Sequence, residues 1–325
     1  MRNAMTGLLV AALLVLGGCG CGKQGEGEGL KGTVTISGAW ALYPMAVKWA
    51  EDFQKLHPGV RFDISAGGAG KGMADVLGGA VDIGLVSREV NPAEIAKGAF
   101  PIAVTKDAVV AVASADNPFV AALQERGITK QRFADIWVTK ALTDWADVLP
   151  GASVGEGAGT TTINVYTRSD ACGAAETWAA YLGAHQEDLE GVGLYGDPSI
   201  AEAVSKDKLG IGYNNVNFAY DAQTRKPAAG LVIIPIDVNE NGRVDDAERF
   251  YATRDEIVRA IADGAYPSPP ARPLYFVTRG APESPVVTEF IRWVLTDGQK
   301  EVAGAGYVAL SDETLERERR KLLGQ

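Results

Sequence analysis

Apolar residues recur along the chain with two alternating kinds of spacing. The segment YPMAVKWAEDFQKLHPG (43–59) carries apolar residues at helical spacing, namely Val47, Ala50, Phe53 and Leu56. This pattern predicts an amphipathic helix. Short continuous apolar runs precede and follow it, and they predict buried strands. Alternation of the two kinds of element over most of the chain indicates an α/β protein.

The same pattern gives the expected order of elements. Strands are expected at 33–38, 60–64, 81–87, 107–114, 209–215, 230–236 and 273–280. Helices are expected at 67–79, after Cys172, and at 254–264, 285–297 and 311–323. The sequence DNP (116–118) is typical of a turn.

The N-terminus has the pattern of an export signal. Arg2 is followed by an apolar run (8–16) that is too short to span a bilayer, and then by Leu16-Gly17-Gly18-Cys19. This tetrapeptide resembles the lipobox of bacterial lipoproteins, which implies a signal peptide over 1–18 and a lipidated Cys19. The alternative is a plain secretory signal with a chance cysteine. Residues 19–31 are rich in glycine and predict a flexible tether, so we expect an extracytoplasmic protein anchored to the membrane by lipid.

Composition and charge narrow the class of protein. The 325 residues are 46% hydrophobic and 22% charged, which suffices for two lobes with separate cores. The formal net charge of -10 argues against nucleic acid, whose binding needs a basic surface. A small anion is not excluded, because oriented amides and one arginine can hold it. After export only Cys21 and Cys172 remain as candidate thiols, and Cys21 lies in the tether, so no disulfide framework is expected.

Six segments, in chain order, carry a family resemblance. They are GAWALYPMAVKWAEDF, GGAGKGMADVLGGAVDIGLVSR, DNP, RSDACGAAETWAAYL, LGIGYNN and FIRWVLTDGQKEVAGAGYVAL. Together they resemble the substrate-binding proteins of Pst-type phosphate ABC transporters. The resemblance implies a two-lobed, type II periplasmic-binding-protein-like fold, in which each lobe is a mixed sheet flanked by helices and two strands cross between the lobes. Lobe 1 would contain 32–113 and 271–325, lobe 2 would contain 114–270, and the crossings would lie near 114 and 271.

The resemblance also implies a function and a set of partners. A monomer would capture phosphate or a related oxyanion between its lobes and deliver it to an ABC transporter permease. It would use no organic cofactor and would not be an enzyme.

By this resemblance, three loops hold the anion. Arg168 would be a charged fork on the anion, with Asp170 as its orienting partner, and Gly173 would open a helix whose free N–H groups face the ligand. Ser87 is retained from the family pattern. The remaining expected contacts are Trp40, Ala41, Leu42, Gly68, Ala69, Gly70, Cys172 and Ala174.

Several hydroxyl groups that the family usually supplies are missing here. Cys172 and Ala174 replace a serine and a threonine, Ala69 replaces a serine, and Trp40 and Ala41 replace a run of hydroxyl residues. The ligand is then either phosphate held more by amides, Arg168 and Ser87, or a different anion to which Trp40 offers a face. Trp40 can also be read as ordinary core.

A catalytic role for Cys172 has little support in the sequence. A cysteine nucleophile needs a base within reach. The chain has two histidines, His57 and His185, and both are remote from Cys172 in sequence. Two alternatives to transport nevertheless stay open: a sensor or adhesion lipoprotein with an eroded pocket on the same fold, and a thiol enzyme.

A second motif, DVNENGRVDDAE (237–248), fits a calcium-binding loop at every ligand position. The expected ligands are Asp237, Asn239, Asn241, the carbonyl of Arg243, Asp245 and Glu248, and Gly242 allows the sharp turn. A strand rather than a helix leads into the loop, so we expect a structural Ca²⁺ site rather than a regulatory helix pair. The alternative is a polar turn.

Overall fold

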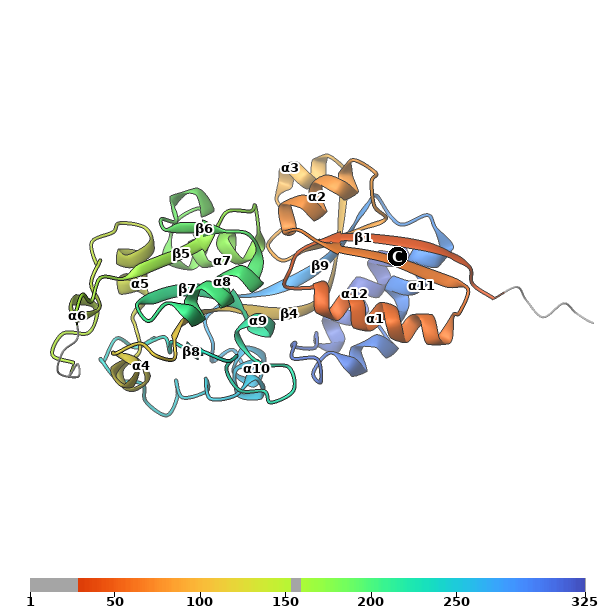
Figure 1. The fold of residues 1–325 in the computed structure, drawn as a ribbon. Helices are drawn as coiled ribbons and strands as arrows, with labels where there is room; N and C mark the ends of the chain where they lie inside the picture. The colour runs from red at the N-terminus through yellow and green to blue at the C-terminus, as the bar shows by residue number, and fades with distance from the viewer. Residues whose placement is uncertain (1–28, 153–158, 325) are drawn as a thin grey trace, which may run out of the picture.

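Two hydrophobic cores lie side by side in the protein and are joined by two strands (Figure 1). The computed structural model describes residues 29–152 and 159–324. The expected signal peptide (1–18), Cys19 and most of the expected tether lie outside the described residues.

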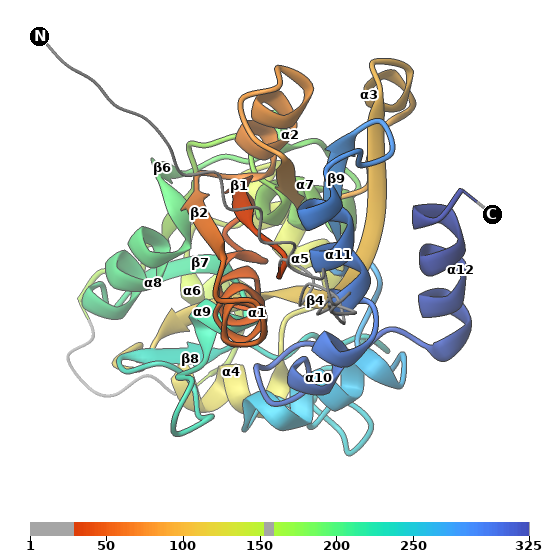
Figure 2. The same ribbon diagram turned by 90° about the vertical axis from the view of Figure 1, so that its right-hand side faces the viewer.

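Lobe 1 is built from both ends of the chain. It contains β1 (Gly32–Gly38), α1 (Tyr43–Leu56), β2 (Val60–Ala66), α2 (Ala69–Leu77), β3 (Ile83–Val86), α3 (Pro92–Ala96), α11 (Pro285–Val294) and α12 (Asp312–Leu322). β1 pairs in parallel with β2 and β3, so the carboxyl ends of all three strands meet at one edge. Figure 2 shows α12 beside the long strand β4 (Ala99–Ser114), where Glu318 of α12 accepts a hydrogen bond from the backbone N–H of Ala103 at 3.3 Å.

Lobe 2 is built from the middle of the chain. It contains α4 (Val120–Arg126), α5 (Lys130–Trp137), α6 (Trp145–Val148), β5 (Asn164–Arg168), α7 (Gly173–Leu182), β6 (Val192–Leu194), α8 (Gly196–Lys206), β7 (Gly210–Asn215), α9 (Val216–Ala219), β8 (Leu231–Ile233) and α10 (Arg254–Ala262). β5 pairs in parallel with β6 and β7, while β7 and β8 run antiparallel to β4. The expectation of an α/β fold with mixed sheets and flanking helices is confirmed.

Two long antiparallel strands, β4 and β9 (Ala271–Arg279), pass between the lobes. On β4 the buried side chains belong to the core of lobe 1 as far as Val104 and to the core of lobe 2 from Ala108. On β9 the same change occurs between Ala271 and Leu274. The changeover on β4 lies between Val104 and Ala108, whereas the family resemblance implied a crossing near residue 114.

In the part of the chain that the structure describes, no helix is long and apolar enough to cross a membrane.

Candidate functional site

Three loops of lobe 1 lie together at the carboxyl ends of its parallel strands. Gly38, the last residue of β1, pairs with Ala66 of β2 and Leu85 of β3. The carbonyl of Gly38 also accepts hydrogen bonds from the N–H groups of Gly67 and Gly68 at 2.9 and 3.1 Å. The loop 39–42, the loop 67–70 and residue 87 are thereby brought to one edge of the sheet, where ligands of open α/β sheets usually bind.

Lobe 2 brings the loop between β5 and α7 against these three loops. A Cβ atom at Gly68 would lie 2.8 Å from the carbonyl oxygen of Ala171, and a Cβ at Gly70 would lie 2.8 Å from the Ala171 side chain. A Cβ at Gly173 would clash with the carbonyl and hydroxyl oxygens of Ser87. The segments predicted to bind the anion therefore meet at the junction of the two lobes, which we call the interlobe cleft, with glycine at the closest approaches.

Arg168 lies at the lobe 2 side of this cleft and binds two carboxylates. Its Nε and Nη2 donate to the two oxygens of Asp170 at 2.8 and 2.7 Å, as the sequence predicts. Its Nη1 donates to Asp197 at 2.7 Å, a partner that sequence reasoning missed. Burial by itself lowers the pKa of Arg168, but Asp197 and Asp170 raise it above its ordinary value. The guanidinium is thus a buried, permanently charged group held between two acids.

Asp197 is itself tied into the end of β7. Its Oδ1 accepts hydrogen bonds from the backbone N–H and the side-chain amide of Asn215 at 2.9 and 2.8 Å. Asp197 stands 29 residues after Arg168, at the start of α8, and no spacing in the sequence links the two. The Arg168 centre therefore carries one more negative than positive charge when both carboxylates are ionised.

Two expected donors of the cleft are already paired inside the protein. The N–H of Gly70 donates to the carbonyl of Ala171 at 3.0 Å, and the N–H of Cys172 donates to Gln186 Oε1 at 3.2 Å. Among the described residues, other N–H groups at these helix starts have no hydrogen-bond acceptor, namely those of Trp40, Ala41, Ala69, Gly173 and Ala174. Ala69, Gly173 and Ala174 belong to the first turns of α2 and α7, where the helix dipole favours an anion, and Trp40 and Ala41 lie just before α1.

Cys172 is the N-cap of α7 rather than an exposed thiol. Its sulfur accepts the N–H of Ala175 at 3.5 Å, and the residue is 5% exposed. Burial raises the pKa of the thiol to about 12, although Arg168 opposes this shift. A thiol with this pKa is almost entirely protonated at neutral pH, and the thiolate is the reactive form, so the burial of Cys172 argues against a cysteine nucleophile.

Three further contacts predicted in lobe 1 differ in character. Ser87 is buried, and its hydroxyl bonds no other described residue. Trp40 crosses the cleft, and its ring carbons lie 3.0 Å from the position that a Cβ of Gly196 would take. Leu42 is buried at the start of α1, and its N–H donates to the carbonyl of Ala39 at 3.1 Å.

The loop 237–248 forms a compact turn held by its own acidic side chains. Asp237 accepts the N–H groups of Asn241 and Gly242 at 3.1 and 2.9 Å. Glu248 accepts the N–H groups of Val238 and Asn239 at 2.7 and 3.2 Å. Within residues 29–152 and 159–324, no group of three or more His, Cys, Asp or Glu side chains is arranged to hold a metal ion.

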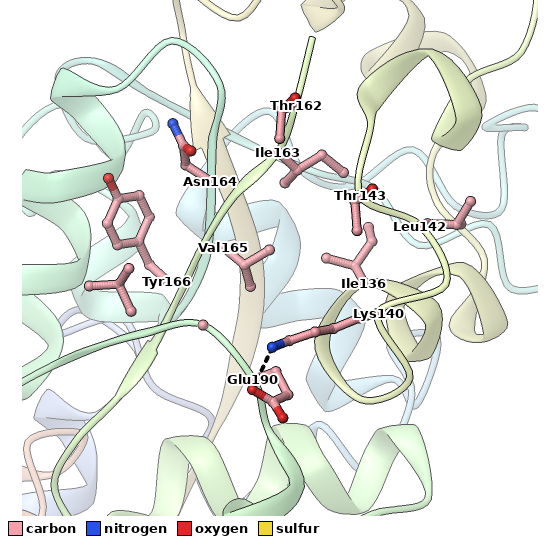
Figure 3. A pocket seen from close by; sticks show the side chains of 12 residues that line it. Ile136, Lys140, Leu142, Thr143, Thr162, Ile163, Asn164, Val165, Tyr166 and Glu190 are labelled. Carbon is pink, nitrogen blue, oxygen red and sulfur yellow. Dashed lines mark ion pairs between the residues drawn. The ribbon is translucent and has the colours of Figure 1, made fainter. Parts of the chain in front are cut away.

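A separate cavity of about 610 Å³ lies in lobe 2, beside β5 (Figure 3). Val165 and Ile163 line it, and an ion pair of 2.8 Å between Lys140 and Glu190 spans one side. It contains none of the residues predicted to bind the anion, so we do not assign the anion site to it.

Known proteins share both the sequence pattern and the fold of this chain. A family model described as the PBP superfamily domain matches residues 24–298. The chain belongs to this family. The phosphate-binding protein PstS of Staphylococcus epidermidis is 26% identical over 316 residues, which cover 94% of this chain and 88% of that relative.

Two solved structures of phosphate transport proteins share the fold of this family member. One, a phosphate ABC transporter substrate-binding protein with bound phosphate, comes from Clostridium perfringens. It has a TM-score of 0.67 at 21% identity, and the match covers 86% of this chain and 100% of that chain. An ABC-type phosphate transport receptor from Vibrio cholerae has a TM-score of 0.60 at 18% identity and covers 85% and 100%. The family resemblance seen in the sequence is confirmed, and it is a resemblance to binding proteins, not to enzymes.

Proposed function

We propose that this protein captures phosphate between its two lobes and presents it to the permease of an ABC transporter. The observation that carries the proposal is the set of unpaired N–H groups just before α1 and at the starts of α2 and α7, contributed by both lobes to one cleft. Unpaired amides at helix N-termini form a ready anion site. The relatives named as phosphate-binding proteins support phosphate as the anion.

The charge of the cleft limits how tightly phosphate is held. Arg168 is the cation expected to hold the anion, but it is already paired with two carboxylates, those of Asp170 and Asp197. The hydroxyl donors expected from the family are missing at positions 172, 174 and 69. A hydrogen bond to a charged group contributes roughly 1.5 to 3 kcal/mol, so we expect phosphate to bind more weakly than in a cleft with the full set of hydroxyls.

Titration calorimetry against phosphate, sulfate and a third oxyanion tests this function. We expect one phosphate per chain, with measurable heat and an affinity above that for sulfate. Absence of phosphate binding at millimolar concentration contradicts the proposal. Preferential binding of another oxyanion would retain the capture mechanism and change the ligand.

A second function is favoured by the internal pairing in the cleft. Because the N–H of Gly70 in lobe 1 already donates to the carbonyl of Ala171 in lobe 2, the two lobes hold each other by a direct hydrogen bond of the protein itself. A sensor or adhesion protein with a closed, empty cleft would have this property. Small-angle scattering distinguishes the two functions: a transporter component should become more compact when phosphate is added, whereas a protein that closes on its own should not.

The location of the protein forms part of the same proposal. We infer export and attachment through lipidated Cys19, on the basis of Leu16-Gly17-Gly18-Cys19. Mass spectrometry of the protein purified from bacterial membranes should give an N-terminus at diacylated Cys19. An unmodified N-terminus at another residue contradicts the anchor.

We also propose that the loop 237–248 binds a structural Ca²⁺. Asp237 and Glu248 are buried, at 2% and 4% exposed, and their hydrogen-bond partners among the described residues are N–H groups rather than cations. The donor set is all oxygen, and along the sequence it has the spacing of a calcium-binding loop, which suits Ca²⁺. The bound ion would balance these buried carboxylates and fix the loop next to α4.

A further inference from the structure

Trp40 is the sole side-chain donor in the first loop of lobe 1. The loop between β1 and α1 consists of Ala39, Trp40, Ala41 and Leu42. Three of these side chains are purely apolar and buried. Any hydrogen bond from a side chain of this loop to a ligand must therefore come from the indole N–H of Trp40.

That indole N–H is buried and has no acceptor among the described residues. Buried tryptophan N–H groups usually find a partner. In this chain Trp49, Trp137 and Trp145 donate to backbone carbonyls at 2.8, 3.2 and 3.0 Å. Trp178 and Trp293 are also unpaired, but they lie inside the cores of lobe 2 and lobe 1, whereas Trp40 lies between the lobes.

The ring of Trp40 fits a notch in the opposite lobe. Gly196, the first residue of α8, has φ +78° and no side chain, and a Cβ there would lie 3.0 Å from the indole ring carbons and 3.4 Å from Nε1. Tyr195 and Phe218, both from lobe 2, flank the indole edge-on with ring centroids 6.1 and 6.4 Å away. The indole of lobe 1 is thus enclosed by lobe 2 when the lobes are together.

The notch adjoins the Arg168 centre. The N–H of Gly196 donates to Asp170 Oδ1 at 3.3 Å, and the same oxygen accepts Arg168 Nε. The indole Nε1 therefore lies next to the backbone that holds Asp170 in place. An indole N–H can only donate, so its missing partner must be an acceptor, as an oxyanion oxygen is.

We propose that Trp40 is a ligand-binding residue of the closed cleft: its indole N–H donates to the bound oxyanion in place of the missing hydroxyls, and its ring seats in the Gly196 notch. The inference rests on the proposed capture of phosphate and adds the donor that couples binding to closure. It also accounts for glycine at 196, since the notch exists only without a side chain.

The substitution Trp40→Phe tests the donor, because phenylalanine keeps an aromatic ring and removes the N–H. We expect phosphate affinity, measured by calorimetry, to fall roughly 10- to 100-fold. Trp293→Phe is the matched control, since it removes an unpaired indole N–H from the core of lobe 1 and should leave affinity unchanged. If Trp40→Phe binds phosphate as the wild type does, Trp40 is packing alone and the inference fails.

A spectroscopic readout separates this failure from failure of the proposed function. In protein labelled with ¹⁵N-tryptophan, the indole resonance that Trp40→Phe lacks should move and exchange more slowly with solvent when phosphate is added, while that of Trp49 should not. Wild-type protein that binds phosphate without this change overturns the role of Trp40 and leaves phosphate capture standing. Wild-type protein with neither heat nor spectral change overturns both.

The notch is tested by a double-mutant cycle. Gly196→Ala strains a residue with φ +78° and also pushes against the indole, and Trp40→Ala removes the second effect while the strain remains. We expect Gly196→Ala to weaken phosphate binding more in the wild type than in the Trp40→Ala background. Equal effects in both backgrounds would show that the indole does not use the notch.

Discussion

Asp107 and Arg272 face each other across the two strands that join the lobes. They are register partners on β4 and β9, and Arg272 Nε lies 3.2 Å from Asp107 Oδ1. The guanidinium of Arg272 also donates to the carbonyl of Gly173 at 2.9 Å and to the side chain of Asn215. A charge pair at the interlobe crossing is therefore bonded directly to the first residue of α7, which faces the cleft.

This position predicts a pH dependence of stability. Burial raises the pKa of Asp107 from 3.8 to about 7, and Arg272 only partly opposes the shift. Between these two values the folded protein keeps a proton that the unfolded chain has lost, so the free energy of unfolding should fall as pH rises through this window. The variant Asp107→Asn should lack this decline. From the size of the pKa shift of Asp107, the free energies of unfolding of the two proteins should diverge by about 4 kcal/mol at most across the window.

Urea unfolding of both proteins at several values from pH 4 to pH 8 measures this effect. Asp116→Asn, which alters an exposed aspartate, serves as the control and should follow the wild type. Parallel curves for wild type and Asp107→Asn would show that Asp107 does not titrate in this window.

The acidic surroundings of Arg168 predict opposite effects for two substitutions. Asp197→Asn removes one negative charge but keeps an oxygen for Asn215, so repulsion of a phosphate dianion decreases and affinity should rise several-fold. Arg168→Lys keeps the charge but loses the fork that Asp170 holds through two nitrogens, so affinity should fall. Calorimetry at constant ionic strength compares the three proteins, and weaker binding by Asp197→Asn would mean that Asp197 positions Arg168 more than it repels the ligand.

Close contact between the lobes makes Gly173 sensitive to substitution. A methyl group there would clash with the backbone and hydroxyl of Ser87, so Gly173→Ala should hold the lobes apart and weaken phosphate binding at least tenfold. Gly304→Ala, whose Cβ would meet its nearest atom at 3.7 Å, is the control and should bind normally. Unchanged affinity in Gly173→Ala would place the contact of the lobes elsewhere.

The sequence predicted most elements but not always the face that each one buries. On α1, Ala50 and Phe53 are buried as expected, whereas Leu56 is 61% exposed and Trp49 is fully buried. A step of three residues advances about 300° around a helix, so four such positions drift by about 180° and cannot share one face. Strand β4 begins at Ala99 rather than near 107. The sequence pattern did not predict its first half, because that half contains a proline and polar residues that interrupt the apolar run.

The candidate site was predictable where its parts are close in sequence. Arg168 and Asp170 are two residues apart, and their pairing follows from the loop alone. Asp197, Gly196 and Arg272 reach the same centre from α8 and β9. Their roles depend on which strand ends meet, which is set by sheet pairing, and local patterns carry no information about it.

Calcium should stabilise the protein through the loop 237–248. Adding a chelator should lower the melting temperature of the wild type, because the buried carboxylates of Asp237 and Glu248 lose their counter-ion. Glu248→Gln should abolish this response. The control Asp246→Asn alters a fully exposed side chain at a position of the loop that supplies no ligand, and it should respond as the wild type does. Scanning calorimetry with and without chelator measures these melting temperatures. If the melting temperature of the wild type does not depend on calcium, the loop is a polar turn and not a Ca²⁺ site.

Replacing Cys172 by serine should improve both the helix and the ligand site. The sulfur now accepts the N–H of Ala175 at 3.5 Å, and a serine oxygen is a stronger acceptor at this N-cap, so Cys172→Ser should raise stability by up to about 1 kcal/mol. A hydroxyl can accept that N–H and at the same time donate its own proton to the anion, whereas a thiol is a weak donor. Phosphate affinity should therefore rise in Cys172→Ser and rise further with Ala174→Thr, while Cys172→Ala, which has no cap, should lose stability. Thermal melts measure the effect on stability, and calorimetry measures the effect on phosphate binding. If Cys172→Ser is more stable but binds phosphate no better, residue 172 is an N-cap but does not contact the anion.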